Sequence, residues 1–362
     1  MNRRSMLIAG VAAVALSTMG SLAAQAAGPG APPDRLTLAV TMTNDAASNE
    51  IKVYDAASGA LLQALATNGS GGVGGNARGV RQLDSELFAA VNNGSNSVAV
   101  FQRDGNRLRF QRLVGTTSAP VSIDFGNGHM YVAGATTADS FPVRGYQVGA
   151  RDGSTTLQLA GGGLPPAGST AQIGVSDAQT LLVTLKTDPT PGTVDVIDLQ
   201  DGAITGSPAA VSAPAGSLTP FGFAVYPDGS ALITLAHTSE DGLFRDGAFT
   251  SVIAAGQAAP CWMTRSDKYV FTANTGSKTI SRLLGTGANI FVDSTVAANV
   301  IGGGSPSDID ADGSVLGVID RGGGASHLSL FALNEFGELS PIGAPIDVGV
   351  PGANGVAIMA AH

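Results

Sequence analysis

The chain has 362 residues, 44% of them hydrophobic and 13% charged, with 50 glycines, 18 prolines and a formal net charge of −9. The high apolar content excludes an intrinsically disordered protein, and the many glycines and prolines exclude a mainly helical one. No run of basic residues lies beyond the first four positions, which excludes nucleic acid as a partner, because binding to a phosphate backbone needs clustered positive charge.

The first 26 residues have the features of an export signal. Arg3 and Arg4 precede an apolar stretch from Met6 to about Ala24, and Ala24-Gln25-Ala26 is a small-x-small cleavage pattern. We expect a signal peptide at residues 1–26, with a retained membrane anchor as the alternative. The paired arginines fit either the ordinary secretory route or the twin-arginine route. We therefore expect a periplasmic or secreted protein with no membrane span after processing.

A short apolar segment recurs seven times along the rest of the chain, at intervals of 40 to 51 residues. Its copies begin at positions 79, 120, 171, 220, 260, 306 and 354. Most copies are followed by a turn, a second apolar run, a polar loop and a third strand. This period is typical of the four-stranded blades of a β-propeller.

The two ends of the chain predict how the ring closes. The chain begins after a leader at residues 27–35 with what reads as a second strand, Leu36–Val40, and ends with an unpartnered first strand, Gly355–Met359. We expect an all-β, seven-bladed propeller over residues 36–362, closed by pairing of the C-terminal strand with the N-terminal blade. An open β-solenoid or two β-sandwiches is the alternative.

Strand and turn segments such as Phe88–Phe101 and Tyr269–Ser281 resemble the lactonase-like seven-bladed propellers. That family includes bacterial 6-phosphogluconolactonases, 3-carboxymuconate cyclases and surface proteins with Tyr-Val-Thr-Asn repeats. The resemblance covers the mature chain and implies a small-molecule site at one mouth of the central channel. It transfers no catalytic residue, because Thr170-Ala171-Gln172 and the loop Ala236–Glu240 depart from the motifs of the phosphogluconolactonases.

We expect the functional mouth at the loops that lead into the inner strands and at those that join second and third strands. His237 is the candidate general base, with Glu240 and Asp241 near enough in sequence to orient it; a solvated loop histidine is the alternative. Asp320 and Arg321 are candidates for holding a carboxylated substrate, with a surface ion pair as the alternative. The expected ligand-binding residues are Arg78, Asn92, Lys186, Asn274 and Asn354.

Metals and cofactors are not expected. Cys261 is the single cysteine, the four histidines form no zinc-type cluster, and Asp310-Ala311-Asp312-Gly313 is interpreted as a turn because it lacks the downstream acidic ligand of a calcium loop. The glycine-rich stretch Gly69–Gly75 lacks the lysine of a phosphate-binding loop.

These observations lead to two hypotheses of function. The first is an exported monomer that binds, and hydrolyses or cyclises, a small anionic or sugar-derived lactone at the channel mouth. The second is a non-catalytic binding scaffold of the cell envelope.

Overall fold

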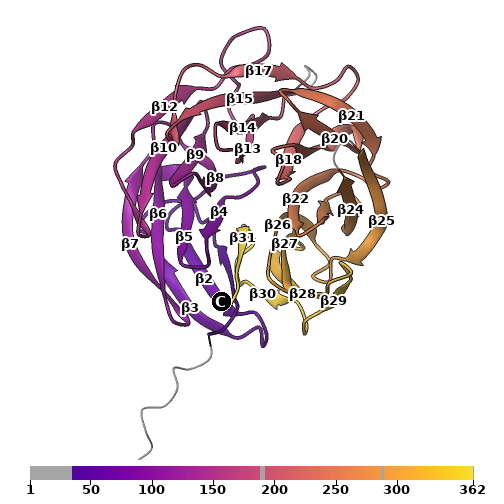
Figure 1. The fold of residues 1–362 in the computed structure, drawn as a ribbon. Coiled ribbons are helices and arrows are strands. Elements are labelled where there is room, and N and C mark those ends of the chain that lie inside the picture. Colours follow the sequence, from indigo (N-terminus) through magenta and orange to yellow (C-terminus); the bar gives the residue numbers. More distant parts are fainter. Residues whose placement is uncertain (1–34, 188–191, 287–288, 362) are drawn as a thin grey trace, which may run out of the picture. The chain divides into compact units, whose positions relative to one another are not determined.

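The computed structural model describes residues 35–187, 192–286 and 289–361. The expected signal peptide and residues 27–34 of the expected leader lie outside the described residues. The described chain forms seven antiparallel sheets, arranged as the blades of a propeller around a central channel (Figure 1). Neighbouring inner strands contact each other around the whole ring. The all-β, seven-bladed prediction is confirmed.

The first four blades lie in chain order. Blade 1 consists of β1 (Leu38–Met42), β2 (Glu50–Asp55), β3 (Leu61–Ala66) and β31 (Asn354–Met359). Blade 2 consists of β4 (Val80–Leu83), β5 (Leu87–Asn92), β6 (Ser97–Asp104) and β7 (Arg107–Gly115). Blade 3 consists of β8 (Pro120–Gly126), β9 (His129–Gly134), β10 (Thr137–Arg144), β11 (Gln147–Val148) and β12 (Gly153–Thr156). Blade 4 consists of β13 (Thr170–Asp177), β14 (Thr180–Leu185), β15 (Thr193–Gln200), β16 (Ala203–Ile204) and β17 (Ala209–Ser212).

The last three blades follow the same plan. Blade 5 consists of β18 (Pro220–Val225), β19 (Ala231–Leu235), β20 (Glu240–Arg245) and β21 (Ala248–Ala254). Blade 6 consists of β22 (Pro260–Ser266), β23 (Tyr269–Asn274), β24 (Thr279–Thr286) and β25 (Asn289–Asn299). Blade 7 consists of β26 (Ser305–Asp312), β27 (Val315–Gly322), β28 (Ala325–Leu333), β29 (Leu339–Pro341) and β30 (Ile346–Asp347).

The inner strands begin within one residue of the predicted positions, and packing between blades explains why these segments are apolar. Second strands such as β5 are buried at every position, because a blade is covered on both faces by its neighbours. Outer strands such as β7 alternate between buried and exposed residues only in part, since one edge faces solvent. The core therefore lies between the blades rather than inside any one of them.

The C-terminal strand closes the ring as predicted. β31 pairs antiparallel with β1, with Leu38 opposite Met359 and Val40 opposite Ala357. Arg103, which is 4% exposed, fixes this closure from the third strand of blade 2. Its guanidinium donates to the carbonyl oxygens of Met359 (3.1 Å) and Ala360 (3.0 Å), and also to that of Leu36. One side chain thus joins the first and last strands of the propeller.

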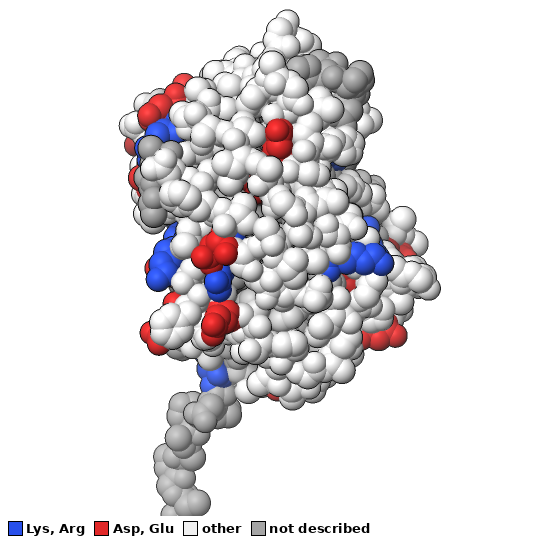
Figure 2. Space-filling model, turned by 90° about the vertical axis from the view of Figure 1, so that its right-hand side faces the viewer, with Lys and Arg blue, Asp and Glu red and all other residues white. Residues whose placement is uncertain are grey.

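Helix is confined to two single 3-10 turns, Asn93–Ser95 and Ala236–Thr238, within the part of the chain that the structure describes. No helix in that part is long and apolar enough to cross a membrane. The side of the ring that bears blades 5 and 6 shows few charged side chains (Figure 2).

We expect Arg103→Met to lower the free energy of unfolding by about 2–4 kcal/mol, because three buried carbonyl groups lose a charged donor. Urea titration followed by far-UV circular dichroism measures this change. Arg107→Met, at an exposed position of β7, is the matched control and should change stability by less than about 0.5 kcal/mol. Equal losses in the two variants would show that Arg103 does not hold the closure.

Candidate functional site

The channel is closed where the inner strands begin, because the connection from β3 to β4 passes across it. We call residues 73–78 of this connection the crossing segment. Asn76 and Ala77 are each 1% exposed, although they lie in a loop. Gly75 has φ +58°, a left-handed conformation that glycine adopts without strain. Asn76 and Ala77 therefore lie inside the ring, whereas Gly74 and Gly75 before them are exposed.

Hydrogen bonds from several blades hold the crossing segment. The Ala77 N–H donates to the carbonyl of Ala171 in β13 (3.0 Å), and the indole N–H of Trp262 in β22 donates to the Asn76 carbonyl (2.8 Å). The Asn76 amide donates to the Val121 carbonyl in β8 (2.7 Å) and accepts a hydrogen bond from Asn354 in β31 (2.7 Å). Four inner strands thus bind two consecutive residues, and the segment obstructs this end of the channel.

Lys186 adds a fifth attachment, from the end of the second strand of blade 4. Its ammonium donates to the carbonyls of Gly75 and Gly168, both at 2.5 Å, and lies 5.5 Å from the centre of the Phe221 ring. Burial lowers the pKa of Lys186 to about 8, so the ammonium is mostly protonated at neutral pH. Its donors are thus directed to backbone carbonyls of the crossing segment and of the chain just before β13.

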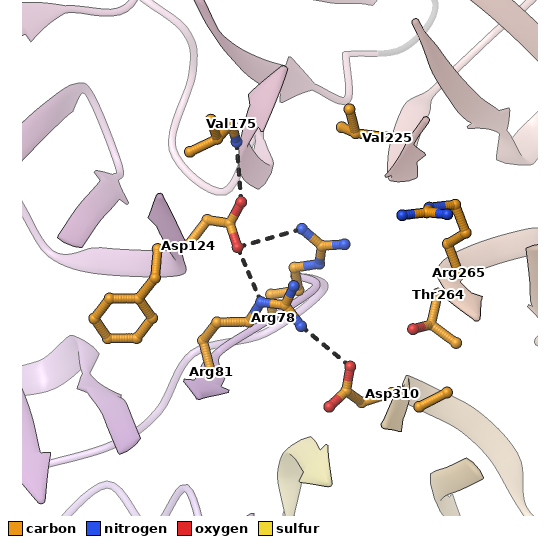
Figure 3. A pocket seen from close by; sticks show the side chains of 10 residues that line it. Arg78, Arg81, Asp124, Val175, Val225, Thr264, Arg265 and Asp310 are labelled. Carbon is orange, nitrogen blue, oxygen red and sulfur yellow. Dashed lines mark hydrogen bonds and ion pairs between the residues drawn. The ribbon is translucent and has the colours of Figure 1, made fainter. Parts of the chain in front are cut away.

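The opposite end of the channel, where the inner strands finish, is open. In β8, β13, β22 and β26 the last two or three residues are half-buried or exposed, whereas most residues before them are buried. A cavity of about 210 Å³, which we call the channel pocket, lies there. It is lined by Arg78, Arg81, Asp124, Phe125, Val175, Val225, Thr264, Arg265, Asp310 and Ala311 (Figure 3).

A network of ion pairs forms one side of the channel pocket. The Arg81 guanidinium bonds Asp124 at 2.9 Å and Asp310 at 3.1 Å, so it joins blades 2, 3 and 7 (Figure 3). Arg78, the last residue of the crossing segment, places a guanidinium nitrogen 3.6 Å from Asp124. Backbone N–H groups of Val175 and Ile358 donate to Asp124 and Asp310, each at 2.9 Å. Both carboxylates are therefore held by charged and neutral donors.

Burial and neighbouring charges shift the pKa values of this network in opposite directions. Burial lowers the pKa of Arg78 to about 10, and the nearby Arg81 adds to the effect. Burial also disfavours the charged form of Arg81, but Asp124 and Asp310 outweigh it and raise the pKa of Arg81. Burial raises the pKa of Asp310, an effect that Arg81 opposes. Beneath them, burial raises the pKa of Asp308 to about 7.

Arg265 is the cation of the channel pocket that has no carboxylate partner among the described residues. It lies across the pocket from Asp124 and points toward the centre (Figure 3). One of its guanidinium nitrogens donates to the carbonyl of Asp267 at 2.5 Å. The lining of the channel pocket contains three arginines and two aspartates, so positive charge is in excess there. The pocket therefore favours an anion.

Of the residues predicted from sequence, Arg78 lines the channel pocket, and three others lie at the closed end. Lys186 and Asn354 hold the crossing segment, as described above. The Arg321 guanidinium donates to the Ala353 carbonyl at 2.8 Å, and burial lowers its pKa. These side chains stabilise the closed end of the channel.

Asn92 and Asn274 are both fully buried at the ends of second strands. The side-chain oxygen of Asn92 accepts hydrogen bonds from Thr67 (2.7 Å) and Asn49 (3.1 Å), which ties blade 2 to blade 1. Asn274 donates to Ser281 at 2.8 Å within blade 6. Neither residue lines the channel pocket.

His237 lies exposed in the 3-10 turn of blade 5, away from the residues that line the channel pocket. Of its expected partners, Glu240 accepts a hydrogen bond from Ser217 at 2.8 Å. Asp241 is 1% exposed, and neither of its carboxylate oxygens has a hydrogen-bond partner in the described structure. Its burial raises the pKa of Asp241 to about 7. The catalytic role of His237 stays a prediction.

Asp320 is fully buried at the end of the second strand of blade 7 and accepts a hydrogen bond from the Gly304 N–H at 3.0 Å. Its other close neighbour is His327, whose Nδ1 lies 3.6 Å from a carboxylate oxygen. Burial raises the pKa of Asp320. Asp320 thus contacts a histidine that the sequence analysis did not pair with it.

Arg81, Asp124 and Arg265 were not predicted as site residues, and Asp310 was interpreted as part of a turn. A signal was present, because charged residues are rare in this chain and rarer still in buried strands. Arg81, Asp124 and Asp310 each stand inside a segment that was predicted to be an inner strand. Charges within apolar inner strands point to the channel.

Asp241 makes stability depend on pH. Because its pKa is about 7 in the native state against an ordinary value of 3.8, the native state binds its proton more tightly than the unfolded chain does. The free energy of unfolding that Asp241 contributes is fully present below about pH 4 and is lost as the pH rises through 7. The loss amounts to at most about 4 kcal/mol. Asp241→Asn should remove this part of the pH dependence.

Urea titrations between pH 4 and 8 give the free energy of unfolding of wild type and Asp241→Asn. The change of their difference with pH measures the contribution of Asp241. Asp246→Asn, at an exposed turn, is the control. A constant difference across this range would mean that Asp241 does not titrate as predicted.

Trp262 is the single tryptophan of the chain and contacts the crossing segment, so its fluorescence reports on that segment. Asn76→Ala removes the donor to the Val121 carbonyl and leaves the Asn354 amide only its 3.5 Å contact with the Val73 carbonyl, so it should lower the free energy of unfolding by about 2 kcal/mol. We expect acrylamide to quench Trp262, 7% exposed in the native state, more strongly in this variant. The control is Asn299→Ala at an exposed strand end. Unchanged quenching would show that the amide of Asn76 does not hold the segment.

No protein-family model matches the chain, and no curated protein sequence matches it. Its structure is similar to the periplasmic gluconolactonase of Pseudomonas aeruginosa, with a TM-score of 0.62 and 15% identity over 90% of this chain and 100% of that one. A protein of Bacteroides uniformis, provisionally assigned as a 6-phosphogluconolactonase, gives 0.62 and 15% over 89% and 99%. Virginiamycin B lyase of Staphylococcus aureus gives 0.52 and 15% over 74% and 84%.

At such identities the comparisons establish the fold alone. The chain has the fold of the lactonase-like seven-bladed propellers, and the resemblance found in the sequence is confirmed at that level.

Proposed function

We propose that this protein binds a small sugar acid or related carboxylic acid in the channel pocket, and that it hydrolyses the corresponding lactone there. The observation that carries the proposal is Arg265, which has no carboxylate partner in the described part of the chain. It faces a pocket that already contains a network of ion pairs (Figure 3). The similarity in fold to a gluconolactonase supports the chemical class of the ligand.

The size and shape of the channel pocket fit a small molecule. Its volume of about 210 Å³ lies below the range of roughly 300–1,000 Å³ that is usual for drug-sized ligands. A guanidinium presents two parallel N–H donors to a carboxylate, which gives affinity and orientation together. Arg265 is the group that would bind the acid, because Arg81 is occupied by Asp124 and Asp310.

The same contact serves the hydrolysis of a lactone. A water molecule attacks the ring carbonyl and gives its proton to Asp310, the carbonyl oxygen becomes an oxyanion beside Arg265, and the ring C–O bond then breaks. The leaving alkoxide takes the proton back from Asp310, so the products are a hydroxyl group and a carboxylic acid. At neutral pH the acid releases its proton to solvent and becomes a carboxylate. Asp310 suits the role of base because burial raises its pKa, while Arg81 keeps it oriented. Arg265 binds the carbonyl oxygen more strongly as its negative charge develops.

Export and the site residues at the closed end of the channel belong to the proposal as predictions. The periplasmic location of one protein of similar fold is compatible with the export signal expected at residues 1–26. His237, Asp320 and Arg321 keep their predicted roles until the experiment below separates the two ends of the channel.

Proton release in weakly buffered solution, with a panel of aldonolactones and muconolactones, tests the proposal. We expect turnover with at least one lactone, and a loss of at least about tenfold in kcat/KM for Arg265→Gln. Arg265→Lys should retain part of the activity, because the charge remains and the paired donors are lost. Asp310→Asn should lower kcat more than it raises KM. Arg245→Gln, in a surface ion pair of blade 5, is the control.

Three outcomes would change the conclusion. Loss of activity in His237→Ala with normal activity in Arg265→Gln would move the reaction to the other end of the channel. Binding of sugar acids without turnover of any lactone would support the non-catalytic scaffold. Turnover that is unaffected by both substitutions would remove both sites.

A further inference from the structure

A second and larger cavity, of about 430 Å³, lies beside the channel pocket. We call it the lateral cleft. It lies between the turns of blades 2 and 3, on the open side of the propeller. Its lining residues are Leu83, Asp84, Gly126, Asn127, Gly128, His129, Val143, Gly145 and Tyr146.

The lateral cleft continues along the same strands that build the channel pocket. In β4, Arg81 lines the pocket and Leu83 lines the cleft. In β8, Phe125 lines the pocket and the next residue, Gly126, lines the cleft. Because a strand advances about 3.3 Å per residue, the residues that line the two cavities lie roughly 3–7 Å apart along these strands.

The two cavities differ in chemistry. The channel pocket is lined by three arginines and two aspartates. The lateral cleft has apolar walls formed by Leu83, Val143 and Tyr146, which pack as half-buried side chains against the hydrophobic core of blades 1 to 3. Asp84 is exposed at its rim. A molecule that fills both cavities has an anionic or lactone head and an apolar tail.

The walls of the lateral cleft are held in place by local structure. Tyr146 has φ +62°, an unusual conformation for a bulky residue, in the turn between β10 and β11. Its carbonyl accepts a hydrogen bond from Gln111 at 3.0 Å. His129 contacts Asp152 at 2.9 Å and the Asn127 carbonyl at 3.0 Å, which fixes the turn between β8 and β9. The cleft is therefore formed before any ligand binds, and an aromatic ring is kept at a position where asparagine or glycine would be less strained.

We propose that the lateral cleft binds an apolar substituent of the ligand whose head occupies the channel pocket, so that the preferred substrate is a lactone or carboxylate with an alkyl chain of several carbons. This inference rests on the proposed function. It deepens that function by naming the part of the substrate that sets specificity.

Calorimetric titration with straight-chain carboxylates from two to eight carbons tests the inference. Each buried methylene group contributes about 0.8 kcal/mol, so once the chain is long enough to enter the cleft, Kd should fall about fourfold per added carbon until the cleft is filled. Tyr146→Asn removes the ring and keeps a residue that tolerates the left-handed conformation, so the turn is preserved. In this variant the dependence on chain length should weaken, with acetate binding unchanged. Asp201→Asn, at another left-handed turn, is the control.

The outcomes distinguish the two proposals. If short carboxylates bind and Arg265→Gln abolishes their binding, while chain length has no effect in wild type, the lateral cleft is not a subsite and the proposed function stands. If chain length has the same effect in wild type and in Tyr146→Asn, the apolar tail lies elsewhere and the inference is overturned. If no carboxylate of any length binds, both proposals are overturned.

Discussion

The hydrogen bonds that hold Asn76 and Ala77 across the channel are the constraint on which the rest of the structure depends. Their partners come from β8, β13, β22 and β31. A buried backbone group without a partner costs about as much as a lost hydrogen bond, so the crossing segment cannot leave the channel without leaving several such groups unpaired. This makes one end of the channel a structural core and leaves the other end open.

The crossing segment also creates the charged centre of the propeller. Arg78 follows directly from it and has φ +55°, a conformation that brings its side chain into the channel while its N–H donates to Asp308 at 3.1 Å. Arg81, three residues later in β4, then bonds both Asp124 and Asp310. Removing one partner of such a buried network leaves an uncompensated charge, so the network keeps its members in fixed positions. Arg265 faces this rigid surface from blade 6.

The fold could be predicted from the sequence because its signals are local and repeated. Each blade carries its own apolar runs and turns. The segments Leu36–Val40 and Gly355–Met359, each without a partner in its own part of the chain, predicted the pairing of β1 with β31. The site could not be predicted in the same way, because it depends on contacts between residues far apart in the chain. The bond from Trp262 to Asn76 spans 186 positions, and the pair Arg81–Asp310 spans 229. No periodic pattern encodes such contacts.

The glycine-rich stretch before β4 shows how composition alone was misleading. It was correctly separated from the phosphate-binding loops, but that conclusion left it without a role. In the structure, glycines allow this chain segment to approach other backbone closely: a Cβ on Gly71 would lie 2.5 Å from the carbonyl carbon of Asn44. A loop that passes close to the backbone of another loop needs such residues as much as a loop that binds an anion does.

Most charged residues of the channel pocket lie on strands, whereas turns between strands form part of the lateral cleft. The charged residues Arg81, Asp124, Arg265 and Asp310 stand on inner strands rather than on loops, and the lateral cleft begins where two of those strands end. Each of these strands is paired with the second strand of its blade and packs against neighbouring inner strands. They therefore move less than loops, so the head of a ligand would meet a preorganised surface. The turns between strands, with Tyr146 among them, tolerate substitution more readily. Changes in substrate tail therefore require only changes in turns, while the charged centre remains as it is.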